Sequence, residues 1–374
     1  MTLPPTPPAP GRPLRAVSLG GGHGLHATLS ALRRLTDDLT AVVTVADDGG
    51  SSGRIRRELD ILPLGDLRMA LDALSGRDLA GPTDPDVWRR TFEHRYGGTG
   101  ALAGHAVGNL VLAGLLDVLG DPVDALDEAC RLLGVRGRVL PMSPHPVDIE
   151  ADVTGIRASQ AMDGSDGGEV EHRIRGQVAV ATTPGRVRRV RLDPRRPRAC
   201  NQAVRAVYAA DVVTLGPGSW FTSVLPHLLV PELLTALTET EARKVLVLNL
   251  AAQAGETSGF SPEEHLDVLT EHAPRLRLDV VVADPAAVPE PDRLRRGAEA
   301  FGATTLLHTV GEPGGAPRHD VAALADALAR AAGRTARPPS TPQHDPSRGE
   351  DVAVGAGSRT PQRRPDEEED QRWP

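Results

Sequence analysis

The chain has 374 residues, of which 40% are apolar but only 2% aromatic, so a sizeable core has to be built from Leu, Val, Ala and Ile. The formal net charge is -8, and the basic residues, all arginines except Lys244, are spread along the chain, which argues against nucleic acid as a partner. Because no run of about 18 apolar residues occurs and no apolar segment follows the N-terminus, the sequence predicts a cytoplasmic protein that has no membrane partner.

The first part of the chain alternates between predicted strands and helices. Residues 1–13 are proline-rich, and we expect them to form a disordered leader. An apolar run at 14–19 then leads into a glycine loop at 20–24, and leucines at helical spacing follow. A second apolar run at 39–45 enters an acidic, glycine-rich segment at 47–53, after which apolar residues again recur at helical spacing. These patterns predict strand, helix, strand and helix in succession.

The later part of the chain adds strands, an insertion and a tail. Residues 101–119 predict a glycine-interrupted apolar helix, and Asp320 is placed to cap a last helix. Residues 169–193 alternate apolar and charged side chains around a turn, which predicts a polar-faced antiparallel hairpin at a sheet edge or as a lid. The composition of residues 333–374 predicts a disordered tail. Further buried strands are predicted at 212–215, 245–248 and 280–283.

These elements predict a single α/β domain over residues 14–332. We expect a Rossmann-like, doubly wound and mostly parallel sheet with a small antiparallel insertion. Cys130 and Cys200 lack the spacing of a zinc site or a disulfide framework, so both are expected to be buried as small apolar side chains. In such a sheet the carboxyl ends of the strands face one crevice, where a ligand is expected.

The glycine loop after the first strand is the first candidate site. A strand that passes through glycines into a helix presents free backbone N–H groups and the positive end of the helix dipole, which suits a phosphate; a plain tight turn is the alternative. Residues 22–27 also satisfy the GxGxxA dinucleotide pattern with Asp47 placed for a ribose, so an NAD-linked oxidoreductase is one hypothesis. The loop residues are Gly20, Gly21, Gly22, His23 and Gly24.

The acidic loop after the second strand is the second candidate site. Asp47 and Asp48 can ligate Mg²⁺, receive a ribose hydroxyl, or cap the helix that begins near Ser51. No other cofactor is indicated. The residues that follow supply amides, hydroxyls and a guanidinium suited to a diphosphate, but such residues are also common at helix starts: Gly49, Ser51, Ser52 and Arg54.

Polar and glycine residues in the later loops complete the candidate site. Because neighbouring strand ends face one crevice, we expect several of them to converge, although each alone is also explained by turns and caps. These candidates are Asp66, Arg68, Asn109, Gly216, Gly218, Ser219, Thr222, Asn249, Gln253 and Glu256.

Several sequence blocks resemble one family. The block TVADDGGSSGRIRRELDILPLGDLR at 44–68, and then GHAVGNL, LGPGSWFTSVLPHLLV and NLAAQAGET, stand in the order found in the gluconeogenesis factor family, the YvcK-like proteins. That family is related to CofD, the 2-phospho-lactate transferases of deazaflavin cofactor synthesis. The resemblance covers about residues 15–332. It implies a Rossmann-like protein that binds a UDP-sugar, notably UDP-N-acetylglucosamine, and that links carbon supply to cell-wall precursors and cell shape.

The resemblance also implies site residues and partners. Phe260 stands where the family has a tyrosine and keeps an aromatic face for stacking, Arg318 is a late cation expected to return to the crevice, and His23 replaces the usual threonine. The motifs follow the YvcK-like branch, which favours a regulator over an enzyme; a magnesium-dependent phospholactyl-type transferase is the alternative. A regulated enzyme of cell-wall precursor synthesis and assembly into a homo-oligomer are further expectations.

Overall fold

The computed structural model describes residues 12–75, 85–155, 171–253 and 255–333. The predicted disorder at residues 1–11 and 334–374 lies outside the described residues. The two predicted buried cysteines, Cys130 and Cys200, are buried and unpaired.

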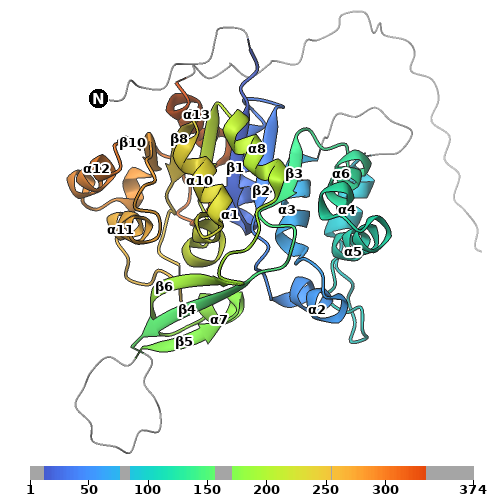
Figure 1. The fold of residues 1–374 in the computed structure, drawn as a ribbon. Coiled ribbons are helices and arrows are strands. Elements are labelled where there is room, and N and C mark those ends of the chain that lie inside the picture. The colour runs from blue at the N-terminus through green and yellow to red at the C-terminus, as the bar shows by residue number, and fades with distance from the viewer. Residues whose placement is uncertain (1–11, 76–84, 156–170, 254, 334–374) are drawn as a thin grey trace, which may run out of the picture. The chain divides into compact units, whose positions relative to one another are not determined.

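A seven-stranded parallel sheet forms the centre of the fold, with the order β10-β9-β8-β7-β1-β2-β3 (Figure 1). Most of its strands are apolar runs whose side chains are buried because helices cover both faces, whereas the edge strand β10 has no buried residue. The strand order reverses between β1 and β7, and this reversal is the switch point at which doubly wound sheets open a crevice. The strands are β1 (Ala16–Gly20), β2 (Leu39–Val43), β3 (Arg138–Pro141), β7 (Val212–Leu215), β8 (Arg243–Val247), β9 (Val280–Ala283) and β10 (Thr304–Leu307).

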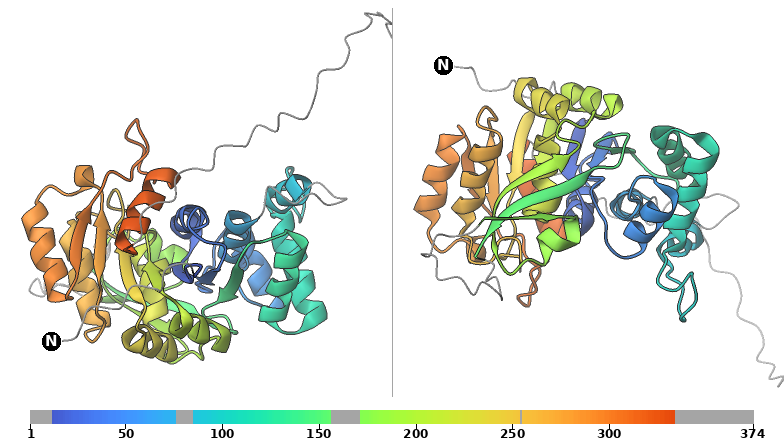
Figure 2. Two further views of the ribbon diagram at one scale, coloured as in Figure 1. Left: turned by 90° about the horizontal axis from the view of Figure 1, so that it is seen from above. Right: turned by 60° about the horizontal axis from the view of Figure 1, so that its bottom comes forward.

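Helices flank the sheet on both faces. Figure 2 shows α1 and α13 together on one face and α8 and α10 together on the other, which confirms the predicted doubly wound arrangement. The helices of the first half are α1 (Gly22–Leu32), α2 (Gly50–Leu59), α3 (Gly65–Leu74), α4 (Pro85–Glu93), α5 (Val107–Leu119) and α6 (Pro122–Leu132). Those of the second half are α8 (Asn201–Ala209), η1 (Trp220–Val224, a π-helix), α9 (Leu225–Leu228), α10 (Pro231–Glu239), α11 (Pro262–His272), η2 (Pro285–Ala287, a 3₁₀ turn), α12 (Pro291–Ala300) and α13 (Val321–Ala331).

Two predicted helix starts have different outcomes. Asp320 caps α13 as predicted, since its carboxylate accepts a hydrogen bond from the Ala323 amide at 2.8 Å. The predicted helix at 101–119 is shorter, because Gly104 adopts a positive φ of 75° and α5 begins only at Val107.

No single helix among the described residues is long and apolar enough to cross a membrane. One pair of helices bent by 75°, Trp220–Leu228 with Pro231–Glu239, is long and apolar enough when the two are taken together.

A small antiparallel sheet is inserted at one end of the parallel strands (Figure 1). Its order is β5-β4-β6, with β4 (Asp148–Thr154) in the middle, β5 (His172–Arg175) and β6 (Arg186–Asp193). The insertion is confirmed, but the predicted hairpin at 169–193 is wrong for its described part, because β5 and β6 both pair with β4. Gly176, at φ 102°, instead turns the chain from β5 into the short helix α7 (Gln177–Ala181).

Candidate functional site

A cavity of about 220 Å³ opens at the carboxyl ends of β1 and β7, where the strand order reverses. We call it the crevice. Both predicted glycine loops contribute to it, together with the acidic loop after β2 and one residue of α7. Its lining residues are Gly21, Gly22, His23, Gly24, Thr44, Asp47, Asp66, Gln177, Gly218, Ser219, Thr222, Ser223 and Gln253.

The two glycine loops approach each other too closely to admit side chains. A Cβ atom on Gly24 would lie 2.1 Å from the carbonyl oxygen of Pro217, and a Cβ atom on Gly21 would lie 2.4 Å from Oδ2 of Asp66. Asn249 holds the second glycine loop, at 216–219, in place. Its Oδ1 accepts a hydrogen bond from the Gly218 amide at 2.8 Å, and its Nδ2 donates to the Gly218 carbonyl at 2.9 Å. The start of α1 therefore lies in close contact with the second glycine loop and with Asp66.

Two carboxyl groups, Asp66 and Asp47, line the crevice beside the start of α1. Asp66 accepts a hydrogen bond from the Gly22 amide, but burial and the negative charge of Asp47 raise the pKa of Asp66 to about 7. Burial also raises the pKa of Asp47, although the Gly49 amide donates to its Oδ1 at 2.9 Å. An acid with a pKa near neutrality exchanges protons readily, so the charge of the crevice depends on pH.

Of the predicted pair Asp47 and Asp48, only Asp47 lines the crevice, although the negative charge of Asp48 still acts on Asp47. Asp48 accepts a hydrogen bond from the Val178 amide at 2.9 Å, which ties the acidic loop to α7, and it does not line the crevice. Among the described residues no group of three or more His, Cys, Asp or Glu side chains is arranged to hold a metal ion. Mg²⁺ stays a prediction, and Asp66 replaces Asp48 as the second carboxylate near which such an ion would bind.

Five predicted site residues on α2, α3 and α5 lie outside the crevice lining: Ser51, Ser52, Arg54, Arg68 and Asn109. Ser51 is buried, and its Oγ lies 3.0 Å from Nδ1 of His105 and 3.1 Å from the donating Nδ2 of Asn109. These contacts dock the start of α2 against the start of α5.

Arg54 donates to the Ala103 carbonyl at 2.8 Å, and the buried Arg68 forms an ion pair with Glu93. Ser52 accepts from the Gly65 amide at 3.1 Å and so joins α2 to α3. These side chains stabilise the wall of the crevice and do not line it.

The second glycine loop is supported by a buried acid. Gly216 adopts a positive φ of 68°, so the chain can turn sharply at the end of β7. Glu256 accepts from the Phe221 amide at 3.0 Å and from Oγ1 of Thr222 at 2.6 Å, which fixes the start of η1. Burial raises the pKa of Glu256. Gln253, which lines the crevice, lies with its Nε2 3.4 Å from Oγ of Ser219.

Phe260 and Arg318 lie away from the crevice. Phe260 packs edge to face against Phe221, with 6.1 Å between ring centroids, and lies under the guanidinium of Arg186. It lines a different cavity, along the antiparallel sheet. Arg318 is 75% exposed in the loop after β10 and pairs with Glu312 at 3.1 Å.

Three crevice residues were not among the predicted ones: Thr44, Gln177 and Ser223. Thr44 directly follows the apolar strand β2, so its place at a strand end was a usable signal. Gln177 comes from the antiparallel insertion, and no motif marks it. The insertion therefore contributes one lining residue to the crevice.

Comparisons with known proteins agree with this architecture. The family described as 2-phospho-L-lactate transferase CofD matches residues 16–306. A Mycobacterium tuberculosis protein named "Putative gluconeogenesis factor" is 57% identical, over 83% of this chain and 88% of its own. The "Gluconeogenesis factor" of Halalkalibacterium halodurans is 38% identical, over 68% and 73%.

The crystal structure of a UPF0052 family member from Bacillus halodurans has the same fold. It superimposes with a TM-score of 0.72 at 32% identity, over 85% of this chain and 99% of that one. The chain belongs to the CofD family, and within it to the group whose relatives are named gluconeogenesis factors.

Proposed function

We propose that the crevice binds the diphosphate of a UDP-sugar, with UDP-N-acetylglucosamine as the expected ligand. The observation that carries the proposal is the meeting of two glycine loops, around Gly21 and Gly218, at the switch point of the sheet. The exposed N-terminal turn of α1 supplies amide groups and a positive dipole end for a phosphate. Gln177, Gln253 and Ser219 supply directed hydrogen bonds for the sugar or the base.

The protein then acts as a cytoplasmic regulator that senses the UDP-sugar and does not turn it over. Its output is an enzyme of cell-wall precursor synthesis whose activity follows the carbon supply, and hence cell shape. The name of the relatives, gluconeogenesis factor, supports a role in directing carbon. A homo-oligomer is the expected working form.

Titration calorimetry of the purified chain with UDP-N-acetylglucosamine tests the ligand. His23→Glu places a carboxylate at the crevice and should weaken binding by tenfold or more, whereas Arg205→Glu, on the exposed side of α8, should not. Absence of binding at millimolar ligand would refute the proposal. Tighter binding of NAD than of the UDP-sugar would favour the oxidoreductase hypothesis instead.

A magnesium-dependent phospholactyl-type transferase is the second candidate. Two observations favour it: the match to the CofD family and the pair of carboxyl groups, Asp47 and Asp66, at the crevice. Mg²⁺ held near these carboxylates would neutralise charge on a transferred phosphoryl group. Incubation of the protein with Mg²⁺, a phospholactyl donor and a deazaflavin tests it, and absence of product eliminates it.

A further inference from the structure

A second cavity, of about 650 Å³, runs along α1 from His26 to the end of that helix. Its walls also include the end of α3, part of α4, Arg136 before β3, and the first residue of α13. We call it the α1–α3 cavity. It has no lining residue in common with the crevice, although α1 contributes to both.

The described lining of this cavity is strongly basic. Arg33, Arg34, Arg89 and Arg136 line it, and Asp72 is the one carboxylate among the described lining residues. In a chain of net charge -8, such a concentration of guanidinium groups gives the cavity a positive potential that opposes the charge of the whole molecule.

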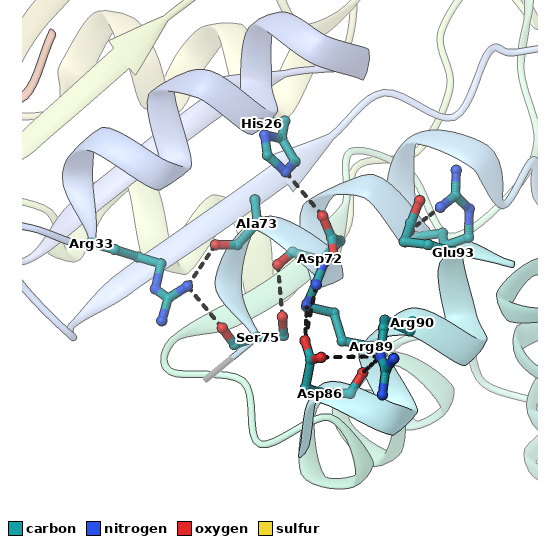
Figure 3. Close-up of polar contacts among 10 residues, drawn as sticks. His26, Arg33, Asp72, Ala73, Ser75, Asp86, Arg89, Arg90 and Glu93 are labelled. Atoms are coloured by element: carbon teal, nitrogen blue, oxygen red, sulfur yellow. Dashed lines mark hydrogen bonds and ion pairs between the residues drawn. The ribbon is translucent and has the colours of Figure 1, made fainter. Parts of the chain in front are cut away.

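The single carboxylate is already engaged. Nε2 of His26 lies 3.1 Å from Oδ2 of Asp72, and Nη1 of Arg89 lies 3.3 Å from Oδ1 (Figure 3). Burial raises the pKa of Asp72, but the hydrogen bonds and charges of His26 and Arg89 outweigh it and lower that pKa, so the carboxylate stays ionised. Asp72 thereby orders two basic side chains. Asp86, which is not among the described lining residues, also accepts hydrogen bonds from Nε and Nη2 of Arg89 at 3.2 and 3.0 Å, so Arg89 is paired with two carboxylates.

A third basic group is fixed at the end of α3. Nη1 of Arg33 donates to the carbonyl oxygens of Ala73 and Ser75, both at 2.9 Å (Figure 3). Those carbonyls carry the negative end of the helix dipole, so the guanidinium is held at a defined position on the cavity wall.

The positive charges of the two remaining lining arginines, Arg34 and Arg136, are hardly neutralised by nearby carboxylates. Arg34 is exposed, and its guanidinium has no hydrogen-bond or ion-pair partner among the described residues. Arg136 lies 3.8 Å from Asp37, but both side chains are largely exposed, and such a pair contributes little. Two guanidinium groups therefore remain able to bind an anion.

We infer that the α1–α3 cavity is a second binding site, which takes a small phosphorylated ligand between the guanidinium groups of Arg34 and Arg136. Guanidinium groups present planar pairs of donors that match the oxygens of a phosphate, and several around one cavity select a multiply charged anion. This site does not depend on the function proposed for the crevice.

Pyrophosphate binding, measured by titration calorimetry at low ionic strength, tests the inference. All variants carry His23→Glu, which should weaken any binding of pyrophosphate at the crevice by about tenfold or more. In that background Arg34→Gln with Arg136→Gln should weaken binding by about tenfold or more. The matched pair Arg205→Gln with Arg296→Gln removes the same charge from exposed positions on α8 and α12, and should change affinity less than twofold. Equal weakening by both pairs, or no binding by the parent, overturns the inference.

Asp72→Asn provides a test by gain of binding. Loss of the only described lining carboxylate should tighten pyrophosphate binding about threefold or more, because one repulsive charge is removed from the cavity wall. A damaged fold cannot produce tighter binding. Unchanged or weaker binding in a variant that melts at the wild-type temperature contradicts the site.

Discussion

We expect UDP-sugar binding to weaken as pH rises in magnesium-free buffer, because Asp66 loses a proton. Asp66→Asn should abolish this pH dependence. The carboxyl of Asp66 accepts the Gly22 amide, one of the donors that a phosphate at the start of α1 would use, and its pKa is raised to about 7. The groups that act on it are Asp47, which repels a charge there, and Arg68, which favours one. An ionised Asp66 would repel a bound diphosphate, so binding should require its protonated form.

The size of the effect follows from that pKa of about 7. The protonated fraction is about nine-tenths at pH 6, half at pH 7 and one-tenth at pH 8, so the affinity of the wild-type protein should fall about tenfold from pH 6 to pH 8. The diphosphate of a UDP-sugar keeps its charge across this range. Asp66→Asn should bind equally at both pH values, and about tenfold more tightly than wild type at pH 8.

Titration calorimetry with a chelator present measures this directly. Asp117→Asn, on the exposed side of α5, is the matched control and should keep the wild-type profile. If Asp66→Asn binds more weakly than wild type at pH 6, then Asp66 contributes an attractive contact and the reasoning is wrong. Repeating the titration with Mg²⁺ distinguishes binding that depends on protonation from binding that depends on the ion. An ion between Asp66 and the diphosphate would make wild-type binding stronger as pH rises.

Three other variants test the supporting contacts. Asp284 accepts amides of Ala286, Val310 and Gly311 at 2.8 to 2.9 Å. Burial raises the pKa of Asp284, but these bonds outweigh it and lower that pKa. Asp284→Asn should therefore lose about 2 kcal/mol of unfolding free energy in urea at pH 7, and the difference should shrink below the unfolded pKa of 3.8 and vanish once pH falls through the lowered pKa of the folded state. Arg68→Gln breaks the ion pair with Glu93 and should lower the free energy of unfolding by about 1 kcal/mol, while ligand affinity stays within twofold. A tenfold loss of affinity at unchanged stability would show instead that Arg68 contacts the ligand. Asn249→Ala releases the Gly218 backbone and should weaken ligand binding tenfold or more in calorimetry, and unchanged affinity would show that the loop holds without it.

Five strands of the parallel sheet were predictable because they are short apolar runs buried on both faces, whereas the two edge strands, β3 and β10, were not predicted. The strands at 212–215 and 280–283 were predicted at their observed bounds, and β1 and β2 within about two residues, since each is a short apolar run that ends at a glycine, an aspartate or a polar loop. The convergence of the glycine loops and Asp47 on one crevice also follows from the fold class alone, because parallel strands present their carboxyl ends at one edge.

The antiparallel insertion and the direction of single side chains were not predictable in the same way. The strand β4 pairs on both sides, so β5 and β6 do not form the hairpin that their alternation suggested. Ser51 and Asn109 are residue types that serve a ligand or a helix start equally well, and only the packing of α2 against α5 decides between these roles. Gln177 reaches the crevice because Asp48 binds the start of α7, a contact between residues 130 positions apart.

The carboxyl groups at the crevice distinguish this site from a simple phosphate loop. A glycine loop at a helix start attracts anions, yet Asp47 and Asp66 stand beside it, and burial raises the pKa of both. A diphosphate can enter only if their charge is removed, either by protons or by a cation. With protons, binding becomes sensitive to pH near neutrality, which suits a regulator. With Mg²⁺, the same carboxylates would position an ion on the phosphates, as a phosphoryl-type transferase requires. The dependence of binding on pH and Mg²⁺ therefore discriminates between the two proposed functions before any substrate is known.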